Sequence, residues 1–182
     1  MGDDVQDREI YKGKLITVRL QTVPRPDGSV AHYEIVDHPD AVGIVAVREG
    51  SEGPEVALVR QSRPAIDAET WEIPAGLVDP NELGDPKHTA VRELLEETGF
   101  VAGKMIFLHR HYPSPGFMNE AISIYLATDL QPAPGAPAPD PTEITQLVWK
   151  PFEDALMMCR DGEIVDGKTV IGLWLARDAL AI

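Results

Sequence analysis

Residues 92–100, which read Arg-Glu-Leu-Leu-Glu-Glu-Thr-Gly-Phe, carry a high density of carboxylates. In a helix, the 3.6-residue period places Glu93 and Glu97 on neighbouring turns of one face, with Glu96 beside them. Like charges at this spacing destabilise a helix by roughly a few tenths of a kcal/mol per pair, so a bound cation would be favourable. Ligands that are all oxygen suit Mg²⁺ or Mn²⁺. On spacing alone, a solvated acidic face explains the run equally well.

The sequence predicts a helix over residues 86–98. Asp85 is a good N-cap, Pro86 fits the first helical position, and Gly99 can end the helix in a left-handed conformation. The predicted apolar stripe of this helix consists of Ala90, Val91, Leu94 and Leu95. If this stripe faces the core, the three glutamates lie at its border or opposite it.

The segment before this helix adds a glycine turn and an acidic loop. Residues 71–76 read Trp-Glu-Ile-Pro-Ala-Gly, a strand-like run that proline and glycine end. The whole order resembles the signature of the Nudix hydrolase family. The matching positions are Gly76, Glu82, Arg92, Glu93, Leu94, Glu96, Glu97, Gly99 and Phe100. Glu82 and Arg92 are two positions further apart than in the family, which leaves the role of Glu82 open to Asp79 or Asp85.

The composition of the chain limits the kinds of partner that it can bind and indicates its cellular compartment. A chain of 182 residues that is 43% hydrophobic can bury a full core. A net charge of -14 argues against nucleic acid or an anionic membrane as a partner, because both are polyanions. No apolar run approaches the roughly 18 residues of a membrane span, and no secretory signal is visible. The single cysteine, Cys159, suits a small buried hydrophobe and a cytoplasmic location.

The rest of the chain predicts an α+β fold. Residues 15–23 and 30–37 read as a hairpin around a turn rich in proline, aspartate and glycine. Residues 41–48 and 55–61 each contain a continuous apolar run, which is typical of central strands buried on both faces. Further strands are expected at 104–112, 121–128 and 144–150, and helices at 152–159 and 169–180. We expect a mixed β-sheet sandwiched between helices.

Within the family, the chain resembles the ADP-ribose pyrophosphatases. The resemblance rests on residues 18–47, on residues 59–64 ahead of the glycine turn, and on Pro115 downstream of the box. It implies the Nudix fold, with an N-terminal β-hairpin domain at residues 1–39 and the hydrolase domain at 40–182. It also implies Mg²⁺-dependent hydrolysis of ADP-ribose to AMP and ribose 5-phosphate. The alternatives are another nucleoside diphosphate sugar as substrate, or an inactive module that senses a nucleotide.

The resemblance also implies roles for individual residues. The expected metal ligands are the Ala75 carbonyl, Glu93, Glu96 and Glu97, of which Glu96 and Glu97 are also expected to be catalytic. Glu143, in the loop before the last strand, is expected to be the base or an additional metal ligand, with Asp140 as the alternative. The expected substrate contacts are Arg63, Glu72, Gly116, Phe117 and Met118. Arg63 could hold a phosphate or form a surface salt bridge. Glu72 could accept a hydrogen bond from Arg63 or from a ribose hydroxyl, or could pack beside Trp71.

The N-terminal hairpin implies a homodimer. Two strands alone are marginal in water, so the pair needs a surface on which to pack. In the subgroup that surface belongs to the other subunit. We therefore expect a homodimer through the N-terminal strands, with a small nucleoside diphosphate sugar as the ligand.

Overall fold

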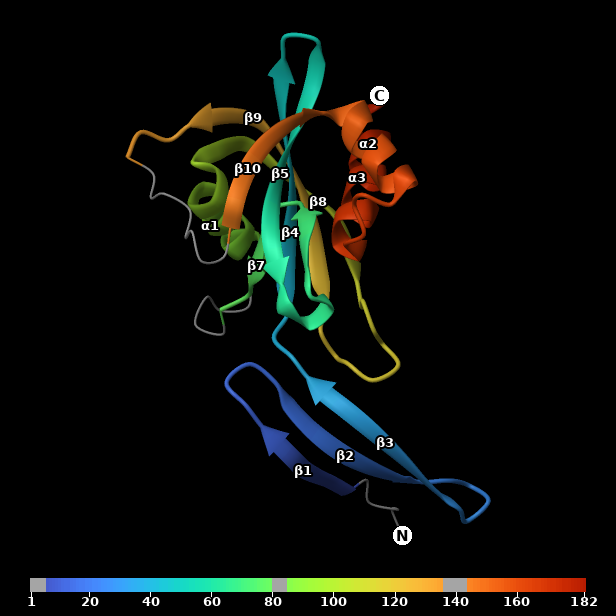
Figure 1. The fold of residues 1–182 in the computed structure, drawn as a ribbon. Coiled ribbons are helices and arrows are strands. Elements are labelled where there is room, and N and C mark those ends of the chain that lie inside the picture. Colours follow the sequence, from blue (N-terminus) through green and yellow to red (C-terminus); the bar gives the residue numbers. More distant parts are fainter. Residues whose placement is uncertain (1–5, 80–84, 136–143) are drawn as a thin grey trace.

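The computed structural model describes residues 6–79, 85–135 and 144–182. Figure 1 shows the arrangement of the strands and helices in these ranges. The strands are β1 (Gln6–Lys12), β2 (Thr17–Pro24), β3 (Val30–Asp37), β4 (Ala41–Gly50), β5 (Gly53–Arg63), β6 (Ala68–Glu72), β7 (Ala75–Leu77), β8 (Phe100–His111), β9 (Ile122–Pro132) and β10 (Ile144–Pro151). The helices are α1 (Pro86–Thr98), α2 (Phe152–Asp161) and α3 (Gly167–Leu180), with a short 3₁₀ helix at Pro64–Ile66.

The N-terminal strands form a separate antiparallel sheet in the order β1-β2-β3 (Figure 1). Strands β2 and β3 are the predicted hairpin, whose turn is closed by Asp27, which accepts hydrogen bonds from the amide and hydroxyl of Ser29. The sequence did not predict β1, because its residues are mostly polar and show no alternation of apolar and polar side chains. All of them are exposed in the structure. The division into domains at residue 39 stays a prediction.

The main sheet is mixed, as the sequence predicts. Its strands lie in the order β10-β5-β4-β9-β8, with β6 paired to β5 and β7 to β4. Strands β4 and β9 are parallel and the other pairs are antiparallel. The β4 and β7 pairing matters for the site, because it fixes Ala75 opposite Gly43 on a central strand.

Helices cover both faces of this sheet (Figure 1). One core lies under α2 and α3, and the other lies under α1. Strand β4 contributes to both: Val45 and Val47 pack into the first core, while Ile44 and Ala46 pack into the second. A strand with apolar side chains on both faces has no polar alternation, which explains its continuous apolar run. The predicted α+β sandwich is confirmed.

Helix α1 matches its predicted bounds, with one correction to its buried face. Asp85 accepts a hydrogen bond from the Lys87 amide at 3.0 Å, and Gly99 ends the helix with φ 74°. The prediction that Val91 faces the core was wrong, because this side chain is 45% exposed. The buried residues of the helix are Thr89, Ala90, Leu94 and Thr98. Thr98 can be buried because its hydroxyl donates to the Leu94 carbonyl, at 2.5 Å.

The N-terminal sheet is joined to the loop between β8 and β9. The Val36 amide donates to the Phe117 carbonyl at 2.7 Å, and the Asn119 amide donates to the Val36 carbonyl at 3.2 Å. The Asn119 side chain adds a hydrogen bond to Asp37, at 2.8 Å. The backbone of this loop is therefore held by β3.

Candidate active site

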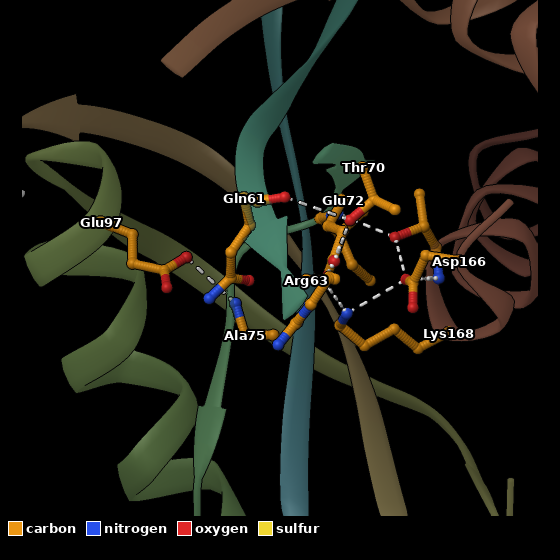
Figure 2. Close-up of polar contacts among 10 residues, drawn as sticks. Gln61, Arg63, Thr70, Glu72, Ala75, Glu97, Asp166 and Lys168 are labelled. Atoms are coloured by element: carbon orange, nitrogen blue, oxygen red, sulfur yellow. Dashed lines mark hydrogen bonds and ion pairs between the residues drawn. The ribbon is translucent and has the colours of Figure 1, made fainter. Parts of the chain in front are cut away.

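Helix α1 brings two of its glutamates against β7. Glu97 Oε2 accepts a hydrogen bond from the Ala75 amide at 3.1 Å (Figure 2). Glu93 packs so closely on Gly76 that a side chain at that position would overlap with its carboxylate. The glycine of the box is therefore required by the close approach of helix and strand. Both predicted carboxylates meet at the Ala75–Gly76 backbone.

Arg92 holds the outer side of the same acidic patch. Its Nη1 lies 2.8 Å from Glu93 Oε1 and donates to Glu96 Oε2 at 2.7 Å. The Glu93 side chain is only 12% exposed, whereas that of Glu96 is 45% exposed. Arg92 therefore pairs with two of the box carboxylates. Glu96 is tied to the solvent side of the helix, so its predicted role as a ligand has less geometric support than those of Glu93 and Glu97.

A second polar cluster surrounds the carboxylate of Glu72, whose side chain is only 2% exposed. Arg63 makes a two-pronged contact, in which Nε donates to Oε1 at 2.7 Å and Nη2 donates to Oε2 at 2.6 Å (Figure 2). The Thr70 hydroxyl donates to Oε1 at 2.5 Å. Of the alternatives that the sequence left open for Glu72, the structure supports the hydrogen bond from Arg63.

Lys168 and Asp166 join this cluster from the start of α3. The Lys168 ammonium donates to Glu72 Oε2 and, at 3.1 Å, to Asp166 Oδ2. Asp166 caps the helix by accepting from the Thr169 amide at 2.9 Å. The Thr169 hydroxyl accepts from the Ile73 amide, at 2.9 Å. These bonds fix the start of α3 against the chain between β6 and β7.

The charges around Glu72 control its protonation. Burial alone would raise the pKa of Glu72, because a carboxylate is poorly solvated away from water. The hydrogen bonds from Arg63 and the charge of Lys168 outweigh this effect and lower the pKa to about 2. The Glu72 hydrogen bond in turn raises the pKa of Arg63. Glu72 is therefore ionised at neutral pH.

This shifted pKa predicts an acid-sensitive stability. Because the pKa of Glu72 falls from its ordinary 4.5 to about 2 on folding, its stabilising contribution is present above pH 4.5. The contribution is lost as the pH falls from 4.5 to 2. We expect a loss of at most about 3 kcal/mol, reduced by solvent screening at the partly exposed Arg63. Urea unfolding of wild type and Glu72→Gln measures it; parallel pH curves for the two proteins would contradict it.

Both clusters line one cavity of about 850 Å³, which we call the main cavity. Its charged and histidine lining residues are His38, Arg63, Glu93, Glu97, His111, Glu120, Asp166 and Lys168. Four carboxylates thus face two cationic side chains. Such a wall repels a diphosphate unless further positive charge is bound.

The predicted substrate residues divide between two cavities. Arg63 and Met118 line the main cavity. Gly116 and Phe117 line a second cavity of about 520 Å³, and Met118 lines this one as well. Glu96 lines neither. The predictions for Glu82, Asp140 and Glu143 lie outside the described residues.

Several residues of the main cavity were not found from the sequence. Lys168 and Asp166 lie far along the chain from the box, and nothing in their spacing links them to it. Glu120 lines the cavity beside His38, whose Nδ1 lies 3.4 Å from Glu120 Oε1. Burial raises the pKa of Glu120. Only the packing of α3 and of the loop after β8 brings these groups together.

The chemical groups that meet at Ala75 and Gly76 suit a hard divalent cation. Glu93 and Glu97 offer only oxygen donors, and the absence of a side chain at Gly76 lets the Glu93 carboxylate reach the strand. Within residues 6–79, 85–135 and 144–182, no three His, Cys, Asp or Glu side chains gather closely enough to hold a metal. A cation here would complete its coordination with backbone, water or substrate oxygens, as Mg²⁺ commonly does.

Comparison with known proteins places this site in a family. Residues 37–170 match the model of the NUDIX domain, which is well over half of the chain. The chain therefore belongs to the Nudix family, as its box of glutamates predicts. No helix in the described part of the chain combines the length and apolar character that a membrane crossing requires.

Individual relatives agree with this assignment over most of the chain. An ADP-ribose pyrophosphatase of Bacillus subtilis (strain 168) is 34% identical over 169 residues, which are 93% of this chain and 89% of that protein. A GDP-mannose pyrophosphatase of Klebsiella pneumoniae is 33% identical over 157 residues, 81% of this chain and 76% of that protein. The crystal structure of an ADP compounds hydrolase shares the fold, with a TM-score of 0.83, 24% identity and coverage of 98% and 94%.

Proposed function

We propose that the protein hydrolyses the diphosphate bond of ADP-ribose, giving AMP and ribose 5-phosphate. The observation that carries this proposal is the seating of Glu93 and Glu97 on the Ala75–Gly76 backbone, in a wall of the main cavity. The choice of ADP-ribose is supported by similarity to the B. subtilis ADP-ribose pyrophosphatase over 93% of the chain. The GDP-mannose pyrophosphatase supports the alternative, another nucleoside diphosphate sugar.

The proposed cofactor is Mg²⁺, with Mn²⁺ as a second possibility. The Ala75 carbonyl, Glu93 and Glu97 would hold it, and Glu96 could contribute through the exposed side of the patch. A bound divalent cation neutralises phosphate charge and makes a bound water more acidic. The charge of the main cavity supports this need, because its carboxylates outnumber its cationic side chains.

The chain's own residues would position the diphosphate. Arg63 gives two N–H groups to Glu72 and keeps other donors of its five for phosphate oxygens. Its side chain is 42% exposed at the main cavity. Because the two hydrogen bonds to Glu72 fix the guanidinium, little orientation entropy would be lost on binding. Arg63 and Lys168 therefore serve as the fixed positive charges of the site.

We propose that Glu143 is the general base, with Asp140 as the alternative. A base must reach a water at the phosphorus, and a loop can bring one to the site when substrate binds. Glu143→Gln should still bind ADP-ribose while kcat falls roughly 100-fold or more, within the range for general-base catalysis. Binding by calorimetry and turnover with Mg²⁺ separate the two effects. An unchanged kcat would assign the base to another residue.

The second cavity is the proposed site of the nucleoside base. Tyr33, Tyr112 and Phe117 line it, and each is about half exposed. Exposed aromatic faces can stack on a flat heterocycle. Met118 and Tyr112 line both cavities, so a dinucleotide-like ligand could run from one to the other.

A panel of substrates tests the function directly. ADP-ribose, ADP-glucose, GDP-mannose and UDP-glucose are incubated with the protein and Mg²⁺, and the products are separated by chromatography. We expect kcat/KM to be highest for ADP-ribose, with AMP as the nucleotide product. A higher value for a non-adenine sugar nucleotide would overturn the substrate, and no turnover of any of them would favour a sensing module.

The N-terminal sheet is the proposed dimer interface. It exposes Ile10, Tyr11, Val30 and Tyr33, and Ala31 is its one buried apolar residue among the residues described. A sheet with so little core of its own is expected to gain stability from a second copy. Sedimentation should therefore give a dimer, and a monomer at micromolar concentration would contradict this. Cytoplasmic location stays a prediction from the single cysteine.

A further inference from the structure

His111 ends β8 at the wall of the main cavity and has an unsatisfied nitrogen. Its Nδ1 is buried and has no hydrogen-bond partner among the residues that the structure describes. The rest of the half-buried ring lines the main cavity, beside its cross-strand neighbour Ile122. A buried polar atom without a partner costs about 1–3 kcal/mol. The missing partner of Nδ1 therefore bears on which of the two ring nitrogens carries the proton.

The environment of the ring keeps it neutral and selects its tautomer. Burial lowers the pKa of His111, and the adjacent His109, whose ring is parallel at 6.1 Å, lowers it further. A neutral imidazole has one N–H donor and one bare nitrogen. Since a buried N–H without an acceptor is the rarer state, the bare nitrogen is assigned to Nδ1. The ring therefore presents its proton, on Nε2, as a donor at the cavity.

The neighbours of His111 favour a neutral ligand group over a phosphate. Glu120 lies in the same wall, two residues before Ile122, which pairs with His111 across the two strands. Asp166 is also near enough to affect the pKa of His111. Lys168 already pairs with Asp166, so Glu120 is the acid that disfavours an anion here, whereas Arg63 and the metal site proposed at Glu93 and Glu97 would mark the diphosphate end. A sugar hydroxyl can accept from the imidazole and donate to a carboxylate.

We propose that His111 determines specificity by donating a hydrogen bond from Nε2 to a hydroxyl of the sugar that follows the diphosphate. This inference rests on the proposed hydrolysis of a nucleoside diphosphate sugar. It adds a contact that the free protein leaves unmade and that a ligand without the hydroxyl cannot make. His111 is not needed for the chemistry at phosphorus, so its effect falls on KM.

Two variants test the contact. His111→Phe keeps the ring and removes both nitrogens, whereas His111→Gln places an amide donor near the position of Nε2. We expect His111→Phe to raise KM for ADP-ribose roughly threefold to tenfold, as one neutral hydrogen bond is worth, with kcat within about twofold of wild type. His111→Gln should recover part of the loss. An unchanged KM in His111→Phe would overturn the proposal.

Deoxy analogues separate binding from folding. ADP-ribose analogues that each lack one hydroxyl of the terminal ribose are assayed with wild type and His111→Phe. With the analogue that lacks the contacted hydroxyl, the KM of wild type should rise by the same threefold to tenfold. The KM of His111→Phe should be no higher with this analogue than with ADP-ribose. An equal loss for every analogue, or a melting temperature lowered by several degrees, would show a structural role and overturn the proposal.

The wild-type protein separates this inference from the proposed function. If wild type prefers another sugar nucleotide, the same variants are assayed with that substrate and with its deoxy analogues. The choice of ADP-ribose then fails while the role of His111 is still decided. If wild type hydrolyses none of them, the proposed function fails and the inference falls with it.

Discussion

Glu97→Gln is expected to lower kcat/KM for ADP-ribose by at least about 100-fold, the scale for losing one electrostatic contributor at an active site. Glutamine has nearly the same shape, and its carbonyl oxygen can still accept the hydrogen bond from Ala75. The fold should therefore persist while the negative charge beside Glu93 is lost. The variant therefore tests the charge of the side chain while its shape and its hydrogen bond to Ala75 are kept.

Turnover at several Mg²⁺ concentrations, together with thermal unfolding, measures this effect. Glu153→Gln is the matched control, because Glu153 is a 62% exposed glutamate at the start of α2. The control should keep wild-type turnover and Mg²⁺ dependence. Wild-type rates in Glu97→Gln would remove this residue from the metal site.

The second large effect is expected in stability. Lys168→Met should lower the free energy of unfolding by about 3 kcal/mol, because it removes one partner from a buried carboxylate. The Lys168 side chain is 8% exposed and donates to both Glu72 and Asp166. Arg63 still neutralises Glu72 in the variant, which keeps the loss at the lower end of the range for breaking a buried pair.

Urea unfolding compares this variant with two others. Lys104→Met is the control, since Lys104 is 68% exposed and pairs with Asp129 at the surface; its effect should stay below about 1 kcal/mol. The double variant Lys168→Met with Glu72→Gln should be more stable than the two separate losses predict, because the charge that needed a partner is gone. If the single variant Lys168→Met were as stable as wild type, the claim that Lys168 stabilises the fold through Glu72 would be wrong.

The sequence predicted the helix half of the site more fully than the rest. Asp85, Pro86 and Gly99 act through contacts close in sequence, so a linear pattern is enough to place α1. A linear pattern could not predict that Thr89 and Thr98 are buried while Val91 is exposed. The burial of the two threonines depends on how the helix rotates against the sheet, and the Thr98 hydroxyl is satisfied within the helix itself.

Contacts between distant residues were beyond the sequence pattern. Lys168 and Glu72 are 96 positions apart, and only the packing of α3 on the sheet joins them. His109 and His111 are two residues apart on β8, a spacing that is common in ordinary strands. Nothing in this pattern indicates that His111 lines a cavity. Arg63 was found because the family pattern includes its segment, and its pairing with Glu72 was one of the alternatives that the sequence left open.

The backbone bonds between β3 and the loop after β8 have a consequence for how activity depends on protein concentration. Val36 and Asn119 make the order of that loop depend on the order of the N-terminal sheet. If a second copy stabilises the sheet, association and substrate binding become linked equilibria, and each strengthens the other. Dilution would then weaken substrate affinity without touching any residue of the cavity. The substrate, by the same linkage, would hold the two copies together.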